Sequence, residues 1–167
     1  YSGTGYGSLT EPMAGFGPPF DHMAIIVSLE DGHYLVDVGF GSFVAEPLRV
    51  VLGEVQNDRN GKFIIRKFDD LYYEISNLDD ERIEYIFSVF ENELSAFSSM
   101  CDFQQYSPES HFTKGKLCSI MTTDGRKTLT DAKFIVTSNG GKTESLIGSE
   151  DEFYQVLNDE FGIARPA

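Results

Sequence analysis

Residues 21–41 read DHMAIIVSLEDGHYLVDVGFG, and the rest of the chain is organised around this stretch. Residues 23–29 form a nearly continuous apolar run with β-branched members, which is typical of a buried strand. The Glu-Asp-Gly at 30–32 predicts a hairpin turn, and residues 34–38 predict the returning strand. His22 therefore stands at the mouth of the first strand, and Asp37 lies near the end of the second.

The His22–Asp37 pair suggests part of a catalytic site. A buried carboxylate needs a partner, because an unpaired buried charge is costly, and Asp37 sits within the apolar Leu-Val-Asp-Val. The partner is a histidine, a backbone amide or an arginine. A histidine that a buried carboxylate orients is two members of a nucleophile–His–acid triad. A lone histidine beside a strand is more commonly structural, so the functional interpretation depends on the pairing.

The hairpin register bears on that pairing. If Asp31 and Gly32 form a two-residue loop, Asp37 faces Ile26, four residues or ~13 Å along the strand from His22. Contact between the two side chains then requires the chain before the strand to bend back. The prolines at 18 and 19 permit such a bend.

The chain contains no convincing nucleophile of its own. Cys101 lies on an expected helix and Cys118 opens an expected strand, so both are interpreted as buried structural cysteines. No serine lies in a G-x-S-x-G elbow. The two cysteines and three scattered histidines have no zinc-ligand spacing, so no metal is expected.

The remaining pattern predicts an α+β chain of two parts. The first part, residues 1–104, is expected to be an antiparallel β-barrel domain that begins with a loop over 1–20 and carries His22 and Asp37. The second part, residues 105–167, is expected to be an inter-domain segment and a small α/β domain. The expected elements are strands at 43–52, 63–68, 71–75, 83–90, 118–122 and 132–137, a helix at 91–105, and a capped C-terminal helix between Ser149 and Gly162.

Charge restricts the partners. The net charge of −14 disfavours nucleic acid. Residues 114–142 are the exception, with six Lys or Arg against two Asp, and would suit an anionic ligand or form a solvated sheet face. No apolar run reaches the ~18–20 residues of a membrane span, so no membrane partner is expected. Because the chain has only two cysteines, a reducing cytoplasm is its simplest expected location.

Four blocks together resemble the arylamine N-acetyltransferase family. They are PFDHM at 19–23, YLVDVGFG at 34–41, SPESHF at 107–112 and CSIMTTDGR at 118–126. The resemblance covers essentially the whole chain and implies a cysteine-protease-like superfamily architecture, in which the second part is a lid. The family's cysteine lies in an R-G-G-x-C-type motif on an N-terminal helical domain. No such motif is present here, so its counterpart is expected upstream of Tyr1.

The resemblance implies acetyl transfer from acetyl-CoA to an arylamine or arylhydrazine, by a ping-pong Cys-His-Asp mechanism that serves xenobiotic metabolism. His22 and Asp37 would be catalytic. The residues that the resemblance places at the active cleft or the coenzyme are Phe40, Gly41, Phe112, Thr122 and Gly125.

Two other readings remain open at this point. One is a transglutaminase-like enzyme or thiol hydrolase that uses the same triad. The other is a non-catalytic fragment or binding module.

Overall fold

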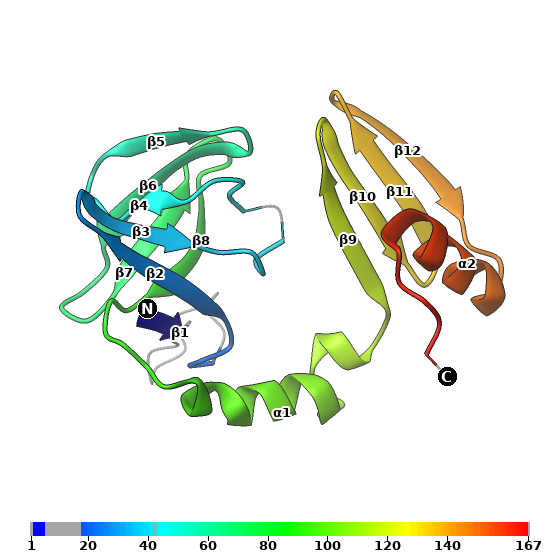
Figure 1. Ribbon diagram of the computed structural model, residues 1–167, viewed down its shortest axis with the longest axis horizontal. Helices are drawn as coiled ribbons and strands as arrows, with labels where there is room; N and C mark the ends of the chain where they lie inside the picture. Colours follow the sequence, from blue (N-terminus) through cyan, green and yellow to red (C-terminus); the bar gives the residue numbers. More distant parts are fainter. Residues whose placement is uncertain (1, 6–17, 42, 167) are drawn as a thin grey trace. The chain divides into compact units, whose positions relative to one another are not determined.

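The computed structural model describes residues 2–5, 18–41 and 43–166, and it divides the chain into two compact units. Unit 1 spans residues 1–102 and unit 2 spans residues 103–167. Figure 1 shows that strands dominate both units. Each unit is described by itself below.

Unit 1 contains two four-stranded antiparallel sheets, β1-β2-β3-β4 and β5-β6-β7-β8. The strands of the first sheet are β1 (Ser2–Gly5), β2 (Met23–Leu29), β3 (Gly32–Val36) and β4 (Leu48–Arg49). Those of the second are β5 (Val55–Asp58), β6 (Gly61–Lys67), β7 (Tyr73–Asn77) and β8 (Arg82–Phe87).

The expected barrel is not confirmed, because neither sheet closes on itself among the residues that the structure describes. An isolated parallel bridge joins Leu52, in the segment between β4 and β5, to Ile65 of β6. The expected loop over residues 1–20 is wrong at β1, which pairs along the edge of β2, and residues 6–17 of that loop lie outside the described residues.

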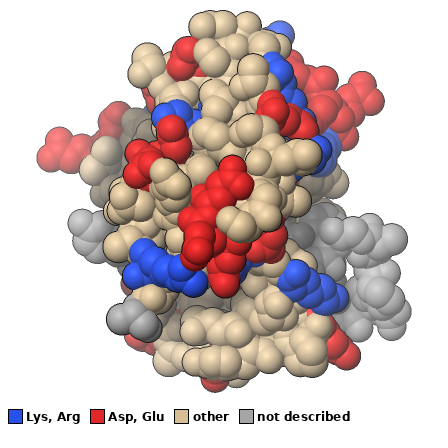
Figure 2. All heavy atoms as spheres, turned by 90° about the vertical axis from the view of Figure 1, so that its right-hand side faces the viewer, with Lys and Arg blue, Asp and Glu red and all other residues tan. Residues whose placement is uncertain are grey.

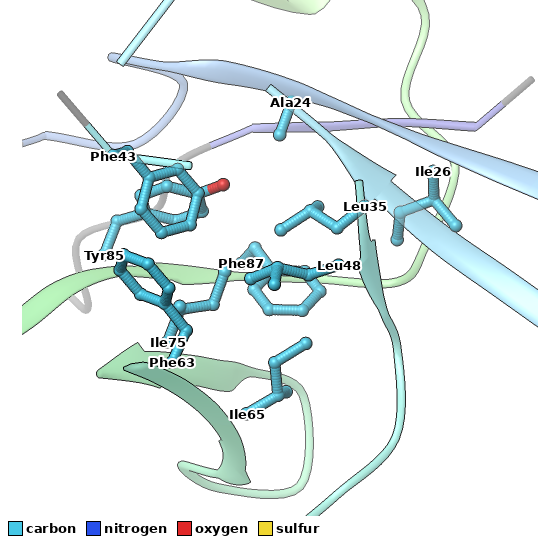
Figure 3. Packing of buried hydrophobic residues seen from close by; sticks show 10 residues of the cluster. All are labelled: Ala24, Ile26, Leu35, Phe43, Leu48, Phe63, Ile65, Ile75, Tyr85 and Phe87. Carbon is cyan, nitrogen blue, oxygen red and sulfur yellow. The ribbon is translucent and has the colours of Figure 1, made fainter. Parts of the chain in front are cut away.

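The core of unit 1 lies between these two sheets. Alternate side chains of a strand point to one face, so β2, β3 and β4 each direct their buried residues toward the second sheet. Figure 3 shows ten of these buried residues in one packed cluster. They are Ala24, Ile26, Leu35, Phe43, Leu48, Phe63, Ile65, Ile75, Tyr85 and Phe87. This core holds the β2–β3 hairpin that carries the His22–Asp37 pair.

Unit 2 is a four-stranded antiparallel sheet with a helix against it. The strands run in the order β12-β11-β10-β9. Their bounds are β9 (Leu117–Thr122), β10 (Gly125–Thr130), β11 (Lys133–Ser138) and β12 (Gly141–Leu146). The helix α2 (Glu150–Phe161) packs Phe153 and Leu157 onto Leu129 of β10.

A short helical segment precedes this sheet. The 3-10 helix η1 (Leu94–Phe97) leads into α1 (Ser98–Tyr106), and η2 (His111–Thr113) follows. The unit boundary falls inside α1. None of the helices in the described residues is long and apolar enough to cross a membrane.

Candidate active site

The register of the β2–β3 hairpin differs from the expected one. Leu29 pairs with Gly32, so the turn consists of Glu30 and Asp31 rather than of Asp31 and Gly32. Gly32 has φ +145°, a conformation that favours glycine. The ladder ends at Ile25 opposite Val36, which places Asp37 one step beyond it. The expectation that Asp37 faces Ile26 is therefore wrong, and the pair needs much less bending than the sequence implied.

His22 and Asp37 form a close hydrogen bond. His22 Nε2 lies 2.6 Å from Asp37 Oδ2, and the Asp37 side chain has no exposed surface, whereas the His22 side chain is 18% exposed. The second oxygen, Oδ1, accepts hydrogen bonds from the backbone amides of Gly39 and Phe40 at 3.0 and 3.1 Å. The chain turn after β3 thus fixes the carboxylate, and the carboxylate fixes the imidazole.

The surroundings of Asp37 keep it ionised. Burial alone raises its pKa, but hydrogen bonds from His22, the Gly39 amide and Tyr85, with the attraction of His22, outweigh burial and hold the pKa below its usual value. An ionised carboxylate only accepts hydrogen bonds, so Nε2 of a neutral His22 carries the proton. Its Nδ1 is then the unprotonated nitrogen, which can act as a base.

Tyr85 is a site residue that the sequence analysis missed as a functional group. The sequence places it only within the strand expected at 83–90. Its side chain is buried, and burial, followed by the negative charge of Asp37 and a hydrogen bond with it, raises the pKa of Tyr85 well above the usual value. Its ring lies 5.4 Å from that of His22. A tyrosine in an apolar strand gives no sequence signal that its hydroxyl meets a carboxylate 48 positions away.

Phe40 lies beside the His22–Asp37 pair. Its ring contacts His22, Phe43 and Tyr85 edge-on, with centroid distances of 5.1, 6.0 and 5.2 Å. Gly41 follows with φ +52°, in the left-handed region that glycine adopts without strain. One side of His22 is therefore an aromatic wall, which is suited to a flat apolar substrate group.

The three expected coenzyme residues of unit 2 do not lie together. Phe112 is exposed on η2, before the start of β9, whereas Thr122 and Gly125 flank the turn at its far end. Figure 1 shows these two ends of β9 well separated. At that turn Asp124 accepts hydrogen bonds from Ser138 Oγ and from Thr122 Oγ1, which helps to join two turns of the sheet.

Gly125 has a structural role of its own. A Cβ at this position would overlap the backbone carbonyl oxygen of Thr137 on β11. The close approach of two strands therefore requires glycine here, whether or not a coenzyme binds nearby.

The basic stretch at 114–142 is largely neutralised. Lys116 pairs with Glu150 at 3.0 Å, and Lys127 pairs with Glu160 at 2.7 Å. Lys133 and Lys142 both pair with Glu144 at 2.6 Å. The face in Figure 2 shows Lys and Arg scattered among Asp and Glu. The local charge that the sequence indicated is thus offset by glutamates that lie later in the chain.

Both cysteines were expected to be buried, and neither is fully buried. Cys101 is exposed on α1, a helix that has no buried residue. The expectation that Cys101 is a buried structural cysteine is therefore wrong. Cys118 is half-buried and packs against the Leu129–Phe153 cluster of unit 2. Among the described residues, no group of three or more His, Cys, Asp or Glu is arranged to hold a metal ion.

Comparison with known proteins matches the chain to N-acetyltransferases. Residues 4–166 match the sequence model of the N-acetyltransferase family. The pineal-gland arylamine N-acetyltransferase NAT-10 of Gallus gallus is 29% identical over 85% of this chain and 58% of its own length. The chain therefore spans little more than half of that relative.

Solved structures share the fold. The arylamine N-acetyltransferase NAT3 of Bacillus cereus, described as having a Cys-His-Glu catalytic triad, matches 98% of this chain and 64% of its own with a TM-score of 0.80 and 27% identity. The Mycobacterium marinum arylamine N-acetyltransferase in complex with CoA matches 97% of this chain and 61% of its own, with a TM-score of 0.77 and 24% identity. The latter match shows a common fold.

Proposed function

The chain belongs to the arylamine N-acetyltransferase family, and we propose that it supplies the base and the orienting acid of an enzyme that acetylates arylamine or arylhydrazine nitrogen from acetyl-CoA. The observation that carries the proposal is the 2.6 Å contact between His22 Nε2 and a fully buried Asp37. A buried ionised carboxylate that holds a partly exposed imidazole is the arrangement that a thiol nucleophile needs.

The nucleophile of the proposal is a cysteine thiolate outside these 167 residues. Cys118 contributes to the packing of unit 2, and Cys101 lies on the exposed surface of α1. The chain also covers only part of its relatives, which leaves a large part of them unmatched. The position of the pair, with Nδ1 of His22 unprotonated, suits a thiol that approaches from the side opposite to Asp37.

The proposed reaction has two half-reactions. His22 Nδ1 takes the thiol proton, the thiolate attacks the thioester carbonyl of acetyl-CoA, and CoA leaves with the proton that His22 returns. The amine then attacks the acetyl-cysteine carbonyl, its proton passes to His22, and the thiolate leaves. Asp37 remains ionised throughout and stabilises the imidazolium.

The two proposed substrates, the acceptor amine and the donor acetyl-CoA, are supported by different observations. The Phe40 ring beside His22 favours a flat aromatic acceptor over an aliphatic one. Acetyl-CoA as donor is supported by the CoA complex of the Mycobacterium marinum fold neighbour. In unit 2, Lys114 is a cation with no ion pair among the described residues, and it is available for a phosphate.

The test uses the full-length protein with radiolabelled acetyl-CoA. Label is expected first on a cysteine and then, after addition of aniline, on the amine. His22→Ala should reduce cysteine labelling by about 10²–10⁴-fold, as expected for loss of a general base. The matched control is His33→Ala, which removes a histidine from the other end of the same hairpin and should label normally.

The outcomes separate the alternatives. Label that is released as acetate but never reaches aniline indicates a thiol hydrolase. A protein that binds CoA but never acquires label indicates a non-catalytic module. Either result, or normal labelling of His22→Ala, would overturn the proposal.

A further inference from the structure

A cavity of about 380 Å³ lies in unit 1, and none of its wall residues belongs to the His22–Asp37 site. Its apolar wall includes Ile26, Val50, Leu52 and Tyr73, which come from both sheets and the segment between them. Ser28 and His33 are its polar wall residues. Small-molecule sites have this composition: a mostly apolar concave surface with a few polar groups that converge on it.

Ser28 and His33 form a hydrogen-bonded pair. They are directly opposite in the β2–β3 ladder, and Ser28 Oγ lies 2.8 Å from His33 Nδ1. Residues two apart on a strand share a face, so Ser28 continues the core-facing row of Ala24 and Ile26. The pair therefore extends the apolar face of the sheet toward the hairpin turn, where both side chains become accessible.

This cavity is separate from the candidate active site. Asp37 lies at the ladder position opposite Ala24, and Ser28 is four residues further along β2, or ~13 Å away. In Figure 3, Ile26 of the cavity wall and Tyr85 of the candidate active site lie on opposite sides of the packed cluster. One hairpin thus carries a polar pair at each end.

Charge restricts what the cavity can bind. Unit 1 has eighteen Asp or Glu against six Lys or Arg, and this field repels anions. A cation would be attracted to the unit, but the residues that line the cavity include no carboxylate to replace its water. A neutral ligand avoids both costs.

We propose that this cavity binds a small neutral molecule with an apolar ring and one hydroxyl group. Ser28 Oγ and the His33 imidazole each donate and accept hydrogen bonds, and a hydroxyl group does the same. The volume suits a ligand of roughly ten non-hydrogen atoms at protein packing density. The site is independent of the proposed acetyl transfer.

The test compares three probes of one shape on the full-length protein with ¹³C-labelled histidine: benzyl alcohol, benzoate and benzylamine. Benzyl alcohol should shift the His33 ring signals saturably, with a Kd of about 0.1–10 mM, as expected for a ligand of this size. The His22 signals should not move. Benzoate and benzylamine should bind at His33 at least about tenfold more weakly, because each brings an uncompensated charge.

Variants test the same site. Ser28→Ala should weaken benzyl alcohol binding by about three- to tenfold through loss of a hydrogen-bonding group. Val50→Phe should abolish binding because its ring fills the cavity. A folded His22→Ala protein should bind normally.

Each of the following results would overturn the proposal: His33 signals that do not respond to benzyl alcohol, equal binding of benzoate, or His22 signals that shift at lower ligand concentration than those of His33. The proposal would also be overturned if another part of the full-length protein covers the cavity and shields the His33 ring from the ligand.

Discussion

At the scale of single residues, Asp37 determines the candidate site. Its Oδ2 holds His22 and its Oδ1 holds the turn through the amides of Gly39 and Phe40. One carboxylate therefore links the fold of the turn to the orientation of the base.

The first prediction concerns Asp37→Asn. The pKa of Asp37 is lowered in the folded protein, so its contribution to stability is present above the unfolded-state pKa and is lost as pH falls through the folded value. At neutral pH the variant should lose about 2–3 kcal/mol of unfolding free energy. The difference from wild type should shrink below about pH 4, which urea unfolding at a series of pH values measures. A constant difference would show that Asp37 is not ionised in the fold.

The second prediction concerns Tyr85→Phe. The ring packing against His22 remains, but the hydrogen bond to Asp37 is lost. Stability should fall by about 1 kcal/mol, and the acid limb of the acetyl-transfer rate should move to higher pH because the carboxylate loses a donor. Tyr73→Phe, a core-edge tyrosine without this contact, is the control. An unchanged pH profile with reduced stability would make Tyr85 purely structural.

At the scale of elements, α2 follows its sequence signals closely. Ser149 Oγ accepts from the Glu152 amide at 3.2 Å, and Gly162 ends the helix with φ +69°, as predicted. The Glu152 carboxylate differs from a standard capping box, since it accepts from the Gly148 amide at 2.7 Å rather than from that of Ser149. The Glu152 carboxylate therefore binds the backbone one residue before the N-cap Ser149.

The third prediction tests this cap. Ser149→Ala should lower the unfolding free energy of the protein by about 1 kcal/mol, because the Glu152 amide loses its acceptor. Ser145→Ala, on the exposed edge strand β12, should change it by less than about 0.5 kcal/mol. Denaturant unfolding of both variants measures the difference, and equal losses would contradict the capping role.

The fourth prediction concerns the β10–β11 contact. Gly125→Ala should disrupt the β9–β12 sheet and cost about 2–4 kcal/mol, because its Cβ overlaps the Thr137 carbonyl. Gly141→Ala in the same sheet places its Cβ 3.4 Å from the Ser138 carbonyl oxygen, an ordinary contact, and should be tolerated. Thermal unfolding compares the two. If Gly125→Ala is as stable as wild type, β10 and β11 are not as close as described.

At the scale of the whole molecule, acidic charge is unequally distributed. Unit 1 carries twelve more acidic than basic residues, whereas unit 2 carries seven basic and nine acidic residues. Within unit 2, Lys133 and Lys142 lower the pKa of Glu144 to about 2 through hydrogen bonds and charge. This glutamate therefore cancels two of the cations that the sequence offered to an anionic ligand.

The fifth prediction follows from that cancellation. Glu144→Gln frees Lys133 and Lys142 and should strengthen CoA binding by the full-length protein by about two- to fivefold at low salt. Lys114→Met should weaken it by a similar factor, and Glu109→Gln should have little effect. Calorimetric titration with CoA at two ionic strengths measures this. An increase from Glu144→Gln that persists at high salt would not be electrostatic.

The sequence by itself determined much of the local structure. The apolar run of β2, the cap and end of α2 and the family all follow from residue patterns within short windows. The polar strands β10 and β12 were missed, because RKTLT and GKTESL carry few apolar residues and become strands through pairing with β9 and β11.

Only the tertiary structure decided the contacts between distant segments. It set the hairpin register that brings His22 to Asp37, placed the Tyr85 hydroxyl at that carboxylate, and paired the lysines of unit 2 with later glutamates. It also opened the expected barrel into two sheets. The physical reason is common to all four: hydrogen bonds and ion pairs act over a few ångströms in space, and a sequence records only neighbours along the chain.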